Sequence, residues 1–394
     1  MADEFKNLNG TTEVKPASSA KKKKTKYRVI LGILIGLLAL IVIGLGVGFF
    51  VIRHYYNKSD YQEIPSEITI DSSALQSLSE SEMAKEETME PSVAESIQRD
   101  IESDIAAARS SLLESLGITE TETQSNAAQP SDNQPGENPG QPAPTAAPAP
   151  VAVGNVYNVL LVGVDRRQPN WNGNSDSMIL ISINNDKGKI TMTSFMRDTY
   201  TNIPGLGWWK MNHAWAVGGA GLCIATVESN FLIHVNNYAS VDFNGLTGLI
   251  DAIGGVDVML QPDEAAHIGL PIGGAQVVHL DGTHALRHAR NRSTGNSYDY
   301  GRTQRQRDIL MAIYNKIKSG GLGSVANAAN AILPYVTHNI DGGTMASLIA
   351  SAPSMLNWPI TQLRVPFDGM YYSQNQNLVP DFQATIGRLW SVIY

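Results

Sequence analysis

Hydrophobic residues follow three different patterns along the chain of 394 residues. From Val29 to Ile52 about 24 apolar residues run without a charge, which is enough for a helix to cross the ~30 Å hydrocarbon core of a bilayer. Between Pro91 and Gly117 apolar residues recur every three or four positions, which predicts one amphipathic helix. After Gly154 strand-like and helical patterns are mixed, so we expect an α/β domain there.

The patterns of this domain predict individual elements. We expect a buried strand at VYNVLLVGVD, which ends at Asp165, and a hairpin formed by SMILISIN and KITMTSFM around the turn Asn185 to Gly188. A helix should run from about residue 212 to 229. The run NGLTGLIDAIGG predicts a helix that two glycines close, followed by the strand VDVML. A further helix should run from about residue 301 to 319.

Charge sets the expected topology of the apolar run. Six cations lie between Lys21 and Arg28 directly before it and only Arg53 and Lys58 follow closely, so the N-terminus should stay in the cytoplasm and the C-terminal part should be exported. A cleaved signal peptide is the alternative, but its apolar core would be only ~7–15 residues long, and Phe49 to Val51 offer no small-residue cleavage site. Cys223 is the only cysteine, which excludes an internal disulfide and a cysteine metal cluster.

The sequence therefore divides into four expected parts: a basic cytoplasmic tail (1–28), a transmembrane helix (29–52), an acidic helical stalk with a Pro/Ala-rich linker (53–153), and an extracytoplasmic domain (154–394). From Arg53 to Pro150 five cations stand against eighteen acids. The apolar stripe of the stalk helix could pair with a second copy, rest on the folded domain, or belong to a solvated spacer. The linker from Thr119 to Val153 favours an extended, poorly ordered chain.

Charged residues gather at three predicted strand ends, where ligands of open sheets usually bind. Asp165 and Arg166 follow the first strand, Asp176 precedes the second, and Arg197 with Asp198 follows the third. Asp165 and Asp176 could converge as two oxygen ligands of the kind that Mg²⁺ or Mn²⁺ prefers. Turn capping is the alternative, because carboxylates at strand ends commonly cap turns.

A dense basic segment, ALRHARNRSTGNSYDYGRTQRQRDIL, suggests an anionic partner. It carries six arginines: Arg287, Arg290, Arg292, Arg302, Arg305 and Arg307. Helical spacing turns Arg302 and Gln306 toward the apolar stripe of the last helix, and an inward arginine at a helix N-terminus suits a phosphate. We expect Arg305 and Arg307 to form a solvated basic face instead.

Three further polar residues carry weaker signals. Lys210 could be functional, structural or exposed, since the sequence shows no partner for it. His284 and His288 are four residues apart and could form a metal pair, but the flanking arginines would repel a cation, so we expect no metal there. A glycine-rich helix around Val217 to Ile224 could line an apolar groove or simply pack in the core.

Seven runs of the chain, taken in order, resemble the motifs of the LytR-CpsA-Psr (LCP) family: NVLLVGVD, SDSMILISI, SFMRDTY, KMNHAWA, LIDAIGGVDV, LDGTHALRHARNR and DYGRTQRQRDIL. The resemblance covers about residues 155–317. It implies a mixed central β-sheet flanked by helices, an α-β-α sandwich. It also implies a bacterial phosphotransferase, anchored by a single pass in the cell membrane, that moves a glycopolymer such as wall teichoic acid or capsular polysaccharide from undecaprenyl pyrophosphate to peptidoglycan.

The resemblance also implies roles for individual residues. The metal-binding aspartates correspond to Asp165 and Asp176, which would hold Mg²⁺ or Mn²⁺. The residues that correspond to the pyrophosphate-binding set are Arg166, Arg197, Lys210, Arg290, Arg292, Arg302 and Gln306. Asp299 or Asp198 would accept the proton of the attacking hydroxyl, with Arg197 and Arg302 beside the phosphates. The chain departs from the family where His288 replaces an aromatic residue and where Thr199, Tyr200 and Thr201 replace a second basic residue.

Three other functions remain open at this stage. A nucleic-acid regulator could use the arginines, but the predicted topology places them away from the chromosome, so we expect no nucleic-acid partner. A non-catalytic module that binds wall polymers would need the arginines but not the two aspartates. A hydrolase of the lipid pyrophosphate would use the same residues with water as acceptor. The expected partners are therefore the lipid-linked glycopolymer, peptidoglycan and the lipid bilayer.

Overall fold

The computed structural model describes residues 53, 57, 60–78, 89–118, 150, 153–166, 172–295, 298–320 and 324–394. The predicted cytoplasmic tail, the predicted membrane span and almost all of the predicted linker lie outside these residues. Within them, no helix is both long and apolar enough to cross a membrane. Residues 54–394 belong to one compact unit, and the following paragraphs concern this unit alone.

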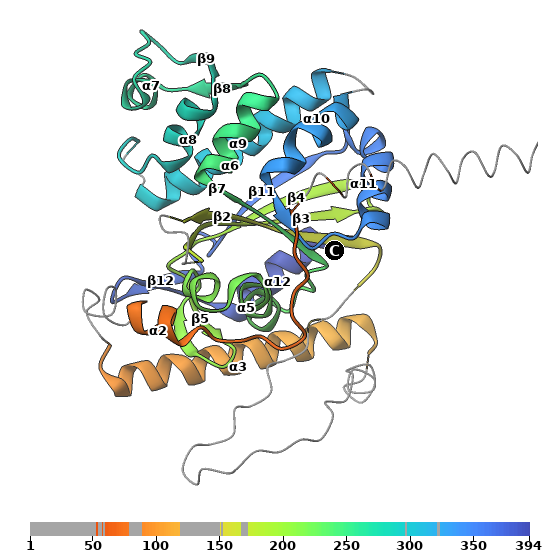
Figure 1. Cartoon of the computed structure of the whole chain (residues 1–394). Helices are drawn as coiled ribbons and strands as arrows, with labels where there is room; N and C mark the ends of the chain where they lie inside the picture. The colour runs from red at the N-terminus through yellow and green to blue at the C-terminus, as the bar shows by residue number, and fades with distance from the viewer. Residues whose placement is uncertain are drawn as a thin grey trace, which may run out of the picture. The chain divides into compact units, whose positions relative to one another are not determined.

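A mixed sheet of seven strands forms its centre (Figure 1). The strands follow the order β1 (Asp60–Tyr61), β10 (Thr337–His338), β7 (Asn237–Asp242), β2 (Val156–Asp165), β3 (Asn174–Asn184), β4 (Lys189–Phe195) and β11 (Ile360–Val365). β2, β3 and β4 are antiparallel, whereas β7 pairs with β2 and β11 pairs with β4 in parallel. The predicted first strand and hairpin are therefore confirmed, and β3 begins two residues before Asp176 rather than after it.

Helices cover both faces of this sheet, as the α/β pattern predicts (Figure 1). One face carries α2 (Ser72–Leu78), α3 (Pro91–Leu116), α5 (His213–Phe231) and α12 (Phe382–Ile393). The other carries α6 (Phe243–Ala252), α8 (Gly282–Arg290), α9 (Tyr298–Ser319) and α10 (Ser324–Ile332). The predicted helices at 212–229, 244–255 and 301–319 correspond to α5, α6 and α9 within a few residues.

Smaller elements complete the unit. Three two-stranded sheets pair β5 (Tyr200–Ile203) with β6 (Gly207–Lys210), β8 (Val256–Leu260) with β9 (Gln276–Leu280), and β12 (Tyr371–Gln374) with β13 (Asn377–Pro380). Further helices among the described residues are α7 (Pro262–Ile268), the 3₁₀ helix η2 (Leu333–Tyr335) and α11 (Gly342–Met355). β8, α7 and β9 pack with α6, α8 and α9 in a core of their own.

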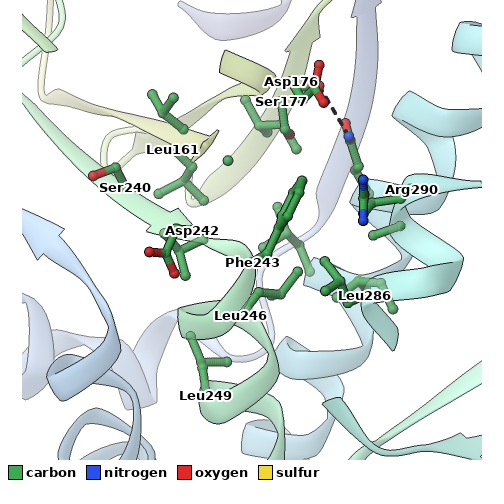
Figure 2. A pocket seen from close by; sticks show the side chains of 18 of the residues that line it. Leu161, Asp176, Ser177, Ser240, Asp242, Phe243, Leu246, Leu249, Leu286 and Arg290 are labelled. Carbon is green, nitrogen blue, oxygen red and sulfur yellow. Dashed lines mark hydrogen bonds between the residues drawn. The ribbon is translucent and has the colours of Figure 1, made fainter. Parts of the chain in front are cut away.

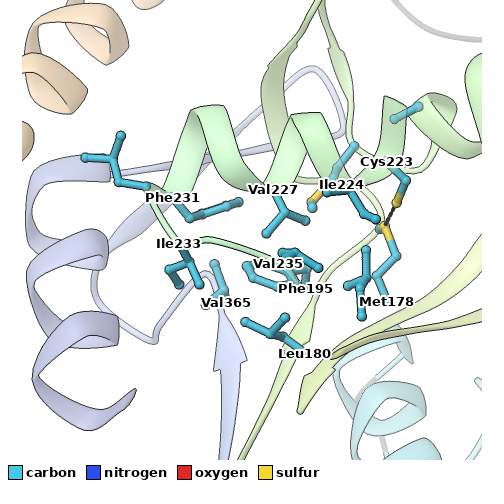
Figure 3. Packing of buried hydrophobic residues seen from close by; sticks show 14 of the residues in the cluster. Met178, Leu180, Phe195, Cys223, Ile224, Val227, Phe231, Ile233, Val235 and Val365 are labelled. Carbon is cyan, nitrogen blue, oxygen red and sulfur yellow. Dashed lines mark hydrogen bonds between the residues drawn. The ribbon is translucent and has the colours of Figure 1, made fainter. Parts of the chain in front are cut away.

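The larger core lies between the sheet and α5 (Figure 3). Its strand residues alternate along the sequence, so Leu160, Val162 and Val164 of β2 enter this core while Leu161 and Gly163 face the opposite side. Val217 and Ile224 of α5 are buried in the same core. The glycine-rich stretch of α5 therefore packs in the core, which was one of its two interpretations.

The amphipathic helix expected in the stalk is confirmed as α3, which ends at the left-handed Gly117. Its apolar stripe, including Ile97, Ile101 and Ile105, is buried in the larger core, where α3 packs against α12. Gln98 donates a hydrogen bond to the Tyr200 hydroxyl at 3.3 Å. Of the three interpretations of this stripe, the structure therefore shows the one in which the helix rests on the folded domain.

Candidate functional site

The candidate site lies at one edge of the central sheet. Because β7 is parallel and β3 antiparallel to β2, the C-terminal ends of β2 and β7 meet the N-terminal end of β3 at this edge. Asp165, the last residue of β2, pairs with Asn174 at the start of β3. Asp242 ends β7 and caps α6 by accepting a hydrogen bond from the Gly245 N–H at 2.7 Å. The sheet thus brings together residues that are far apart in the sequence.

A β-bulge turns Asp176 toward the site. Gly163 pairs with Ser177 and Val164 pairs with Ser175, so Asp176 is the extra residue between them. Ser175 donates from its hydroxyl to the backbone oxygen of Asn212 on the α5 side, whereas Asp176 and Ser177 both line a cavity on the opposite face. A bulge re-aims side chains in this way, because it breaks the strict alternation of a strand. By the same alternation along β2, Asp165 belongs to the face of Asp176.

Three arginines surround Asp176. They come from distant parts of the sequence, one after the end of a strand, one after the end of a helix and one from within a helix. Its Oδ1 lies 3.4 Å from Arg197 Nη1, 3.7 Å from Arg292 Nη2 and 3.7 Å from Arg302 Nη1. Gln306 donates from Nε2 to the Asp176 backbone oxygen at 3.3 Å. The inward orientation predicted for Arg302 and Gln306 is therefore confirmed, and Arg302 is only 2% exposed.

The same three arginines also contact Asp299. The nearest atoms are Arg292 Nε at 3.0 Å, Arg197 Nε at 3.1 Å and Arg302 Nη2 at 3.5 Å. Arg197 Nε is also 3.4 Å from Asp198 Oδ2. Asp176, Asp198 and Asp299 thus hold three guanidinium groups in one cluster, which we call the arginine cluster (Arg197, Arg292 and Arg302). Carboxylates that hold arginines in place can be exchanged for the oxygen atoms of a phosphate, since both accept the same forked hydrogen bonds.

The environment shifts the pKa values of two groups in this cluster. Burial raises the pKa of Asp299, Arg197 and Arg292 lower it, and the Asp198 carboxylate raises it again, so the net pKa lies above the ordinary value of 3.8. Burial lowers the pKa of Arg197, but Asp198, Asp299 and Asp176 raise it by more, so this arginine stays charged. Asp299 is therefore the cluster carboxylate whose proton affinity is increased, as a proton acceptor requires.

A cavity of about 570 Å³ extends from the cluster between the sheet and helices α6, α8 and α9. Figure 2 shows Asp176 near one end and Leu249 at the other, with Phe243, Leu246 and Leu286 between them. Arg292, Arg302 and Gln306 also line it. The cavity is thus charged where it meets the cluster and apolar along the rest of its length, so it suits a ligand with an anionic head and a hydrocarbon tail.

The remaining predicted site residues lie at different places. Asp165 is buried at the end of β2, and Lys210 is buried at the end of β6. Arg290 lines the cavity with its guanidinium stacked over the Phe243 ring, 4.2 Å from its centre, and makes none of the contacts of the arginine cluster. Arg166 is exposed just after β2. The structure thus brings Arg197, Arg292 and Arg302 together with Asp176 and Asp299, whereas Arg290 lies on Phe243 in the same cavity.

The expectation that Arg305 and Arg307 form a solvated basic face is wrong, because both are buried. Arg305 pairs with Glu264 Oε1 at 2.7 Å and donates to the backbone oxygens of Asn291 and Thr294, each at 3.0 Å. Arg307 donates to the Ser194 hydroxyl at 2.7 Å and to Gln362 Oε1 at 3.1 Å. Helical periodicity could not show this, since α9 is packed on several sides and not along one stripe.

Arg305 therefore supports the segment that carries Arg292. In the segment from Asn291 to Gly295, two backbone oxygens accept hydrogen bonds from Arg305. The Gly295 N–H donates to Asp263 Oδ2 at 3.0 Å. Glu264 is itself fixed, because its Oε2 accepts from the Gln261 N–H at 3.0 Å in a capping box of α7. The sequence patterns gave no sign of this support, because Glu264 and Asp263 lie on α7, a helix that the patterns did not predict.

The two spaced histidines lie in different environments. His284 Nδ1 contacts Asp281 Oδ1 at 2.7 Å, whereas His288 is 1% exposed and neither of its ring nitrogens has a hydrogen-bond partner among the described residues. Burial lowers the pKa of His288 to about 4, so the ring is neutral at pH 7. His288 therefore fills space in the core.

Comparison with known proteins identifies the family. The model of the LytR_cpsA_psr family matches residues 114–386, which is more than half of the chain. The chain belongs to this family. The resemblance of the seven motifs is thereby confirmed, and the match extends beyond them to α3 and to α12.

Individual LytR-CpsA-Psr relatives agree. The polyisoprenyl-teichoic acid–peptidoglycan teichoic acid transferase TagU of Oceanobacillus iheyensis is 39% identical over 192 residues, which is 47% of this chain and 58% of that protein. The chain thus matches less than two thirds of that relative. The crystal structure of protein gbs0355 from Streptococcus agalactiae covers 60% of this chain and 88% of its own at 26% identity and a TM-score of 0.51. TagT bound to LIIa-WTA covers 60% and 91% at 25% identity and a TM-score of 0.50.

Proposed function

We propose that this chain is a phosphotransferase that moves an anionic glycopolymer from a polyprenyl-pyrophosphate carrier to peptidoglycan in the bacterial cell wall. The single observation that carries the proposal is the junction of the arginine cluster with the apolar cavity. A lipid pyrophosphate has the same two parts in the same order, an anionic head and a long hydrocarbon tail. The name of the TagU relative supports teichoic acid as the polymer and peptidoglycan as the acceptor.

The arginine cluster would bind the pyrophosphate. Phosphoryl transfer needs charge neutralisation and alignment more than covalent chemistry, and planar guanidinium groups supply both. Arg302 is suited to this task, because it is buried and its Nε has no hydrogen-bond partner among the described residues. A phosphate oxygen would provide that partner and would release Asp176 and Asp299 from their arginines. Lys210, Arg166 and Arg290 would add further positive charge around the donor.

Asp299 would accept the proton of the attacking sugar hydroxyl. Its carboxylate lies beside Arg197 and Arg292, which would bind the phosphate that the hydroxyl attacks. Its pKa is raised above that of an ordinary aspartate, so it holds a proton more strongly. Asp198 lies next to it and raises its pKa, which makes Asp198 the second candidate for the same role.

Asp165 and Asp176 would hold Mg²⁺ or Mn²⁺. Both are hard oxygen donors on the same face of neighbouring strands, which fits these ions. No group of three or more His, Cys, Asp or Glu side chains in the described part of the chain could hold a metal ion. The other ligands would therefore be phosphate oxygens and water, which is a common arrangement for Mg²⁺. The ion would supply positive charge beside the donor's phosphates.

The proposal includes an anchor in the membrane. The apolar run from Val29 to Ile52 would hold the chain in the cytoplasmic membrane, with the basic tail inside and the site outside. The donor's tail belongs to the same bilayer, so anchor and donor would stay close together.

A transfer assay tests this proposal. Purified full-length protein in detergent would receive a labelled lipid-linked polymer and purified peptidoglycan, and the label would be followed into peptidoglycan, water and unreacted lipid. We expect label in peptidoglycan, a loss of about a hundredfold or more in Arg302→Ala and Asp176→Ala, and little change in the control Lys318→Ala at the exposed end of α9. Transfer by Arg302→Ala and Asp176→Ala at the parent rate would contradict the mechanism.

Two other outcomes would indicate different functions. Label released to water with peptidoglycan present would indicate a lipid-pyrophosphate hydrolase. Polymer binding that survives in Asp165→Ala while no label moves in the parent protein would indicate a non-catalytic module that binds wall polymers.

A further inference from the structure

A second, smaller hollow adjoins the cavity. It has a volume of about 460 Å³ and is lined by Thr247 of α6, His267 of α7, and Thr283, Leu286, Arg287 and Arg290 of α8. Leu286 and Arg290 line the larger cavity as well, so the two spaces share these side chains. Its polar lining consists of two guanidinium groups, an imidazole and two hydroxyls. None of these groups is a carboxylate, and all of them carry a hydrogen-bond donor, although the Thr247 hydroxyl already donates to the Phe243 backbone oxygen at 2.9 Å.

The two arginines of this hollow differ from three of the other four arginines of the basic segment, since Arg307 is buried among uncharged partners. Arg292, Arg302 and Arg305 each contact a carboxylate. Arg287 and Arg290 are exposed and have no carboxylate partner among the described residues. They lie one turn apart on α8, where two like charges repel each other. A bound anion would relieve this repulsion.

Contacts hold both guanidinium groups at the hollow. Arg290 is stacked on Phe243, and this contact uses the face of the guanidinium and leaves its in-plane N–H groups free to donate. Arg287 donates from Nη1 to the Ile268 backbone oxygen at 3.4 Å, which places it across the end of α7 and leaves its other N–H groups available. The hollow therefore presents donors that are already oriented.

We propose that this hollow binds a phosphodiester group of the glycopolymer part of the donor. The inference rests on the proposed function. With the pyrophosphate at the arginine cluster, Arg290 lies between the cluster's cavity and the hollow, so it marks a path along α8 for the polymer. A neutral sugar chain would gain little from two uncompensated guanidinium groups, whereas a chain that carries a phosphate in every repeat unit would be bound by them.

Two lipid-linked donor substrates distinguish the effect of this hollow from that of the reaction centre. One is a polyprenyl pyrophosphate with a short neutral oligosaccharide, and the other is the same carrier extended by glycerol phosphate units. In full-length protein at low salt, we expect Arg287→Gln to raise the KM of the extended donor about three- to tenfold, with kcat unchanged. The KM of the neutral donor should not change. Arg287→Lys should keep part of the effect, and the control Arg99→Gln on the exposed side of α3 should change neither donor.

A binding measurement keeps the inference distinct from the proposed function. A lipid-free glycerol phosphate oligomer should bind the parent protein in calorimetry, and Arg287→Gln should weaken this binding by a similar factor. If the parent protein transfers neither donor but binds the oligomer through Arg287, the proposed function fails and the hollow remains an anion site. Equal KM increases for both donors, an increase in the KM of peptidoglycan instead, or oligomer binding that ignores Arg287 would overturn the inference.

Discussion

Arg302 joins two elements of the site, since its Nη2 is 3.5 Å from Asp299 Oδ1 one turn earlier on α9 and its Nη1 is 3.7 Å from Asp176 Oδ1 on β3. A single buried guanidinium therefore fixes the start of α9 against the edge of the sheet. The cost of burying this charge is offset by its two carboxylate neighbours. The cluster is thus assembled before any phosphate binds, which reduces the ordering that binding requires.

The pH dependence of the reaction should follow the protonation of the Asp299 carboxylate. Because its pKa is raised, activity should fall on acidification at a higher pH than an ordinary aspartate would cause, as the carboxylate takes up a proton. Asp299→Asn should lower kcat/KM about a hundredfold or more and remove this acidic limb. Asp198→Asn should move the limb to lower pH, since it removes the neighbouring charge that raises the pKa. A pH–rate profile in which the Asp198→Asn limb stays in place would argue against this assignment.

Arg305 should affect donor binding by holding the segment that carries Arg292 in place. Arg305→Lys keeps the charge near Glu264 but loses the fork that holds Asn291 and Thr294, so we expect a loss of about 1–3 kcal/mol in the free energy of unfolding and a higher KM for the donor. A merely structural role would leave the effects of Arg305→Lys and Arg292→Ala on KM additive. We expect the double variant to be little worse than Arg292→Ala alone, because both changes remove the same donor contact.

The cavity should select for the length of the hydrocarbon tail. Ala289 lines it between Leu286 and Arg290, so Ala289→Leu would extend a side chain into the space. We expect the KM of a long-tailed donor to rise about tenfold and that of a short-tailed donor to change little, since about 1.4 kcal/mol corresponds to a factor of ten. Ala266→Leu on the exposed side of α7 is the control. Equal effects on both donors would mean that the tail does not occupy this cavity.

His288 should make stability depend on pH. Its pKa is about 4 in the folded protein and its ordinary value is 6.5, so the unfolded chain binds a proton that the folded protein does not. The stabilisation is complete above about pH 6.5 and is lost as the pH falls toward 4, by at most about 3 kcal/mol. Urea unfolding at several pH values should therefore show a shallower decline in His288→Phe. The exposed His267→Phe should behave like the parent protein.

Much of the fold could be predicted because local patterns determined it. The apolar run of β2, the turn at Gly188, the glycine pair after α6 and the stripe of α3 each give a signal within a few residues, and each predicted element is present. The inward orientation of Arg302 followed from the same periodicity. The burial of Arg305 and Arg307 did not, because the groups that bury them come from α7, β4 and β11.

The sequence by itself determined the main helices and strands and the family, since spacing and side-chain chemistry are local properties. Only the tertiary structure decided which charges meet. It placed Arg197, Arg292 and Arg302 around Asp176 and Asp299, stacked Arg290 on Phe243, and put the apolar cavity under α6, α8 and α9 instead of along α5. The physical reason is that strand pairing, one bulge in β3 and helix packing bring together residues more than a hundred positions apart, and no local pattern records those contacts.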